Sequence, residues 1–116
     1  MSNGSINFEE MGITAQILCP EFLEEIRNEG LAARVERFCN ELSEVPERHT
    51  TRLKEKYGDD IPQDVRSVGI SLGEHMQQIA PYMNPANNST LAPVFVAAKM
   101  SAAMAEVRAL NHVLGY

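Results

Sequence analysis

Apolar residues recur at helical spacing along almost the whole chain, and this feature limits the possible folds more than any other. From Leu31, steps of four, three, four and three lead through Val35, Phe38 and Leu42 to Val45. No stretch alternates apolar and polar residues for long enough to form a convincing strand. The sequence therefore predicts an all-α fold, a compact bundle of five or six helices that forms one domain over residues 1–116.

Prolines, glycines and capping residues divide this pattern into separate helices. Pro20 and Pro62 stand where a helix can begin, because the first turn needs no amide donor, and Gly30 and Gly58 suit helix ends. Pro46 is expected to end or kink the preceding helix, in which Arg34 occupies the polar side. We expect helices over residues 7–18, 20–28, 31–45, 50–57, 61–79 and 89–114, after a flexible start over residues 1–7.

The last expected helix is apolar on two sides. One stripe contains Val96, Met100, Ala103, Val107, Leu110 and Leu114. The second stripe contains Leu91, Phe95, Ala98, Ala102, Ala105 and Ala109. At 100° per residue the two stripes point about 140° apart. A long helix of this kind is either the centre of the bundle or meets a second subunit through its alanine side.

Gly69 and Gly73 lie four residues apart, to one side of an apolar stripe that runs from Ile61 to Ile79. Glycine costs up to about 1 kcal/mol within a helix, so the pair suggests that another helix packs closely there. We expect Gly69 and Gly73, with the residues Phe95, Ala98, Ala102, Ala105 and Ala109, to form either close internal packing or an oligomer interface. A homodimer with the last helix near its two-fold axis is favoured.

The negative charge is concentrated in the first part of the chain. The net charge is −6, and residues 1–45 hold nine acidic and three basic residues, whereas 46–60 and 61–116 are each neutral overall. Such a field repels phosphate backbones, so direct nucleic-acid binding is not expected. A basic protein partner could meet an acidic face made of Glu21, Glu24, Glu25, Glu29, Glu36 and Glu41. A purely solubilising role for this face is the alternative.

Two cysteines and the absence of an export signal favour a reducing compartment. Cys19 and Cys39 lack a CxxC spacing, and the first residues have neither a basic stretch nor an apolar core. We expect two reduced thiols in a cytoplasmic protein, with a Cys19–Cys39 bridge as the less favoured alternative. No run is long enough for a membrane span, so no membrane association is expected.

No catalytic or metal-binding pattern stands out. His49, His75 and His112 fit no ligand motif, and acidic pairs such as Asp59–Asp60 stand at helix starts or on polar sides. The segment Val68–Gly73 lies within a helical stripe, and not after a strand as a phosphate loop would. We therefore expect no enzymatic activity, no cofactor and no metal.

These features favour a small acidic interaction module that binds a partner protein and modulates or inhibits it. At the level of composition alone, the chain resembles small acidic helical proteins of phages and mobile elements, some of which inhibit nucleic-acid-binding machinery. Two alternatives stay open: a structural subunit that self-associates through its C-terminal helix, and a ligand-binding or enzymatic bundle whose site forms only in three dimensions.

Overall fold

The computed structural model describes residues 20–116, and this part of the chain is helical with no strand. Its α-helices are α1 (Pro20–Glu29), α2 (Leu31–Glu41), α3 (Val45–Tyr57), α4 (Gln63–Ile79) and α5 (Ala92–Leu114), and the 3-10 helices η2 (Ala80–Met83) and η3 (Pro85–Asn87) join α4 to α5. The all-α prediction is confirmed for these residues.

Several expectations concern residues 1–19 and lie outside the described residues. They are the flexible start over residues 1–7, the helix over residues 7–18 and the Cys19–Cys39 bridge. The number of helices in the complete bundle also depends on this segment and stays a prediction.

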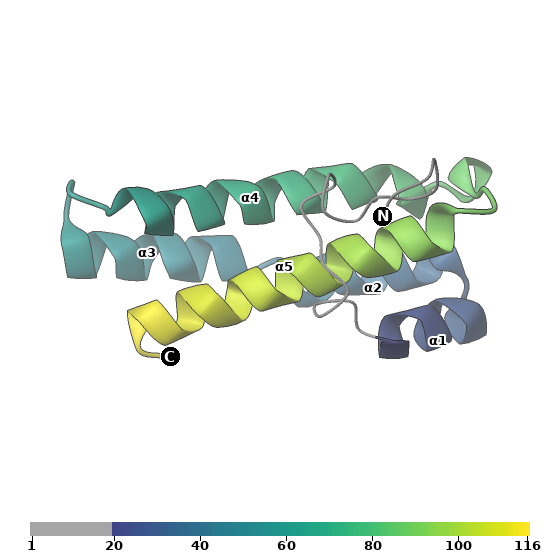
Figure 1. Ribbon diagram of the computed structural model, residues 1–116, viewed down its shortest axis with the longest axis horizontal. Coiled ribbons are helices and arrows are strands. Elements are labelled where there is room, and N and C mark those ends of the chain that lie inside the picture. The colour runs from purple at the N-terminus through teal and green to yellow at the C-terminus, as the bar shows by residue number, and fades with distance from the viewer. Residues whose placement is uncertain (1–19) are drawn as a thin grey trace, which may run out of the picture.

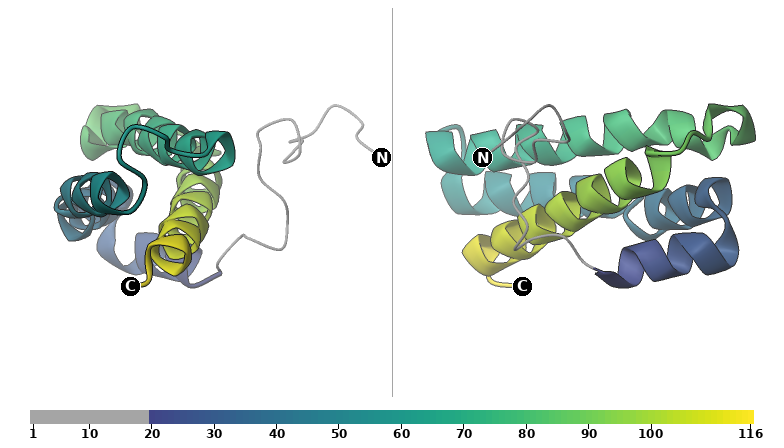
Figure 2. Two further views of the ribbon diagram at one scale, coloured as in Figure 1. Left: turned by 90° about the vertical axis from the view of Figure 1, so that its left-hand side faces the viewer. Right: turned by 45° about the vertical axis from the view of Figure 1, so that its right-hand side comes forward.

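The helices form two unlike ends joined by α5 (Figure 1). At one end α2 runs back over α1, and at the other end α3 lies beside α4. α5 crosses the molecule between the two ends and packs against α4, α1 and α3. The left view of Figure 2 looks along the molecule from the α3 end, where α3, α4 and α5 are seen nearly end-on.

Single residues set the boundaries between the first three helices. Gly30 separates α1 from α2 and has φ +95°, a conformation that residues with a Cβ rarely adopt. The predicted helix over residues 31–45 is wrong at its end, because α2 stops at Glu41 and Val45 begins α3. Pro46 therefore opens a helix and does not close one, which agrees with the tolerance of the first helical turn for proline.

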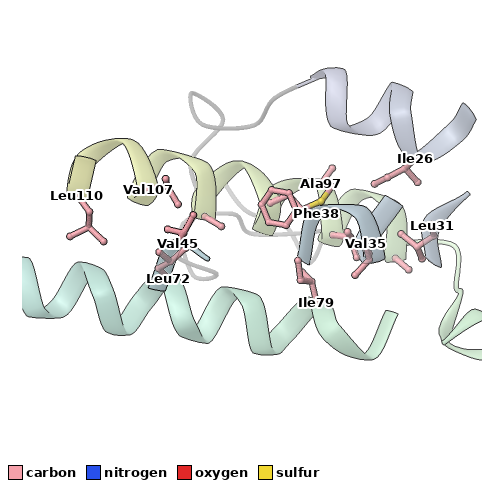
Figure 3. Close-up of a cluster of buried hydrophobic side chains, with 14 of the residues drawn as sticks. Ile26, Leu31, Val35, Phe38, Val45, Leu72, Ile79, Ala97, Val107 and Leu110 are labelled. Atoms are coloured by element: carbon pink, nitrogen blue, oxygen red, sulfur yellow. The ribbon is translucent and has the colours of Figure 1, made fainter. Parts of the chain in front are cut away.

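The core lies where α5 passes between the other helices (Figure 3). Val35 and Phe38 of α2, Ile79 of α4 and Ala97 of α5 are almost fully buried there. All eight residues from Val96 to Ala103 are buried, so this stretch of α5 is covered on every side. The small side chains in it allow neighbouring helices to approach α5 closely.

Candidate functional site

Two arginines on α2 occupy the middle of the predicted acidic face. Arg34 donates from Nε to Glu25 Oε1 at 2.8 Å. Arg37 donates to Glu29 Oε2 at 2.7 Å and to Glu41 Oε2 at 2.9 Å. Three of the six predicted partner-binding glutamates therefore form ion pairs within the chain, and the pairs of Glu25 and Glu29 tie α1 to α2.

Arg34 is buried, contrary to its expected place on the polar side of its helix. Only 3% of it is exposed, and its guanidinium carbon lies 5.2 Å from the ring centroid of Phe22 and 5.8 Å from that of Phe38. The helical period placed Arg34 correctly around α2, but α1 folds over that side and covers it. A buried cation held between two rings and a carboxylate stabilises the α1–α2 pair.

Arg37 also changes the acid–base behaviour of one of its partners, Glu29. The hydrogen bond from Arg37 is the main cause that lowers the pKa of Glu29 below its ordinary value of 4.5.

The other three glutamates of the predicted acidic face, Glu21, Glu24 and Glu36, are exposed. Residues 20–45 hold seven acidic and three basic residues. The α1–α2 end thus stays negative overall.

The other end of the molecule contains an apolar groove between α3 and α4. The groove has a volume of about 370 Å3. α3 and α4 make few contacts with each other, and both pack against α5. Leu53 of α3, Leu72 of α4 and Leu110 of α5 are among the residues that line it, and Arg66 and Ile70 of α4 also border it. The groove is therefore an apolar surface with one cation.

Gly69 and Gly73 form part of the α4 wall of this groove. Both are exposed, and a Cβ built on either of them would meet nothing within 4 Å. The expectation of close internal packing on the two glycines is therefore wrong for the described residues. Their place on an open wall leaves the alternative, an interface with another molecule, as a prediction.

The alanine stripe of α5 does not face the glycines. Ala98 and Ala102 are buried, Phe95 and Ala105 are half-buried, and Ala109 is exposed. The predicted surface is thus divided between the core and the solvent. Two-fold packing through the whole stripe would require its buried central alanines to be uncovered.

His49 of α3 is a lining residue that the sequence did not single out. It is 4% exposed, and its Nε2 lies 2.8 Å from Asn111 Oδ1 of α5, while its Nδ1 is buried with no hydrogen-bond partner. The one available signal was its spacing, four residues after Val45 and four before Leu53. That spacing indicates an inward-facing side chain but not its distant partner.

A second polar cluster joins α4 to α5. Ser71 Oγ donates to Glu106 Oε2 at 2.5 Å and lies 3.3 Å from His75 Nε2, which is itself 3.5 Å from Glu106 Oε1. In a Ser–His–acid triad the acid bonds the other imidazole nitrogen, but here His75 Nδ1 has no partner. This cluster holds two helices together and lacks the geometry of an activated nucleophile.

The C-terminal residues fasten α3 to α5. Arg52 donates to the carbonyl of Leu114 at 3.1 Å, Lys56 donates to that of Val113, and the Tyr116 ring lies 5.3 and 5.2 Å from the guanidinium carbons of Arg48 and Arg52. Contacts of these C-terminal residues therefore add to the apolar contacts that hold α3. The three basic side chains also suit the negative end of the α5 dipole.

The described residues give no indication of a metal site or a membrane span. Among residues 20–116, no group of three histidine, cysteine or acidic side chains could hold a metal ion, and no helix is long and apolar enough to cross a membrane. Comparison of the chain with protein-family models, curated proteins and solved structures finds no match.

Proposed function

We propose that this protein is a small, non-enzymatic interaction module that takes an amphipathic helix of a partner protein into the α3–α4 groove. The observation that carries the proposal is the groove itself, with its apolar lining and its two bare glycines. An apolar groove between helices is a common way to bind the apolar side of another helix.

The lining defines the chemistry of the bound helix. The open wall at Gly69 and Gly73 leaves room for a branched aliphatic side chain to lie against the α4 backbone. Arg66 borders the same groove, so an acidic residue one turn from that side chain would form an ion pair with it. The occupant is a helix with one central aliphatic residue and a nearby carboxylate.

The acidic α1–α2 end has a supporting role in this proposal. Its remaining negative charge would steer any partner whose surface is basic outside the bound helix, which mainly raises the association rate and is screened by salt. Modulation or inhibition of that partner would follow from occupation of its helix.

A labelled synthetic peptide tests the groove directly. The probe is a helical peptide with isoleucine at its centre and glutamate four residues later, and fluorescence anisotropy measures its binding. We expect Gly69→Leu and Gly73→Leu to fill the groove and weaken binding by about tenfold or more. Gln78→Leu, which adds the same side chain to an exposed position of α4 outside the groove lining, is the matched control.

The two sets of variants decide the outcome. Weakening by the glycine variants alone supports the proposal. Equal affinity for wild type and both glycine variants would place peptide binding elsewhere and overturn it, and so would an absence of binding.

The volume of the groove favours one second candidate, a small apolar ligand. About 370 Å3 lies within the range of roughly 300–1,000 Å3 that small-molecule pockets occupy. Binding of 8-anilinonaphthalene-1-sulfonate at one site per chain, abolished by Gly69→Leu and unaffected by the peptide, would favour this candidate over the helix.

A further inference from the structure

We propose that the helix bound by the groove is α4 of a second copy of this chain, so that two copies form a symmetric dimer through their α4 helices. This inference rests on the proposed function, because it names the partner of the same groove. The chain itself carries the required occupant, an exposed aliphatic residue with a carboxylate one turn later: Ile70 and Glu74 of α4.

The projecting side chain and the recess that receives it lie on one helix. Ile70 is 56% exposed and borders the groove, between Gly69 and Gly73 in the sequence. No other described helix covers the outer side of α4 (Figure 1). When a surface contains both a projection and a matching recess, a two-fold axis brings each projection against the recess of the other copy.

The charges fit the same arrangement. If two α4 helices run antiparallel and cross midway between Gly69 and Gly73, each Arg66 comes level with position 76 of the partner. At 1.5 Å per residue that is about 3 Å along the axis from the partner's Glu74. The long arginine side chain spans this offset, so two reciprocal ion pairs flank the central contact.

The dimer explains why α4 contains two glycines. Within one chain they lower helix stability without allowing any close contact, since nothing lies within 4 Å of a Cβ at either position. Between two helices, glycine allows backbones to approach closely and leaves space for a branched side chain. The buried Ala98 and Ala102 of α5 leave α4 as the better position for the axis.

Sedimentation velocity over a wide concentration range measures the association. We expect wild type to change from monomer to dimer, and Ile70→Glu to weaken the dimer by about tenfold or more. The control is Leu91→Glu, because Leu91 is 57% exposed and lies at the start of α5, outside the groove. It should leave association unchanged. A wild type that stays monomeric at millimolar concentration would overturn the inference.

Charge exchange tests the register. Arg66→Glu and Glu74→Arg should each weaken the dimer, and the double variant R66E/E74R should restore most of the loss, because the pairs re-form with opposite sign. Single variants without effect, or a double variant no better than either single one, would contradict the antiparallel register.

The peptide and sedimentation experiments separate the two proposals. A monomeric chain that still binds the peptide, with loss on Gly69→Leu, would refute the dimer and keep the groove as a docking site. If the chain neither dimerises nor binds the peptide, both proposals fail. Self-association together with competition by the peptide at the groove supports both.

Discussion

The two ends of this molecule use the same kind of helices and reach opposite results. α1 and α2 are joined by a single glycine and close on each other through Arg34 and Arg37 of α2 and two glutamates of α1, Glu25 and Glu29. α3 and α4 also follow each other in the chain and lie side by side, yet a groove separates them. Adjacency in sequence therefore does not determine whether two helices close on each other.

The side chains at the two contacts account for the difference. Phe22, Arg34 and Phe38 are large and fill the space between α1 and α2. Gly69 and Gly73 contribute no side chain to the space between α3 and α4. α1 and α2 pack on each other as well as on α5, whereas α3 and α4 are each held mainly by α5.

The largest expected effect concerns the closed end. Arg34→Ala removes a buried cation together with its stacking on two rings, so we expect the free energy of unfolding to fall by about 2–3 kcal/mol. Urea denaturation measures it. Arg37→Ala is the control, because Arg37 contacts the same acidic residues but is 41% exposed, and water screens exposed ion pairs, so its loss should be clearly smaller. Equal losses would mean that burial is not what distinguishes Arg34.

The second prediction concerns how α3 is held. Because α5 is the one described helix on which α3 packs closely, and another side of α3 borders the groove, its amides should exchange hydrogen faster than those around Val35 and Leu72. Tyr116→Ala removes two cation–π contacts and should lower the protection of α3 by about 1–2 kcal/mol, without a comparable change in α2. Hydrogen exchange followed by NMR measures the protection of α3 and α2. If α3 is protected equally in Tyr116→Ala and in wild type, Tyr116 does not anchor α3.

Glycine substitutions should have opposite signs at the two ends. Gly69→Ala and Gly73→Ala should each stabilise the monomer by about 0.5–1 kcal/mol, because the methyl group meets nothing and alanine favours a helix. Gly30→Ala should destabilise by about 1 kcal/mol, because φ +95° is strained for alanine. Thermal unfolding at low protein concentration checks the signs, and a loss of stability at Gly73 would mean that α4 is not open there.

The smallest effect is a pH dependence at the closed end. Because Arg37 lowers the pKa of Glu29 in the folded chain, the stability that this pair contributes is fully present above pH 4.5, the ordinary pKa of the carboxyl group. It is lost as the pH falls towards the lowered pKa. Glu29→Gln should therefore have its largest stability deficit near neutral pH, and the deficit should shrink below pH 4.5. A deficit that does not change with pH would exclude the ion pair as its cause.

Periodicity and capping residues determined the helical class and most helix positions. Steps of three and four place Val35, Phe38, Leu72 and Val107 on inward faces, and these positions are buried in the structure. Where the two apolar stripes of the C-terminal helix pass through residues 96–103, the helix is covered all round, whereas Leu91 and Ala109 of the second stripe are exposed. These features depend on the spacing of residues within one helix, and spacing is visible in a sequence.

Only the tertiary structure decided which helix covers which side. Arg34 lies on the polar side of α2 by its spacing, yet it is buried because α1 supplies Phe22 and Glu25 above it. Gly69 and Gly73 have the spacing of a close-packed pair, yet they face a groove. A helical period gives the direction of a side chain around its own axis, whereas the element that meets it depends on how all the helices pack around α5.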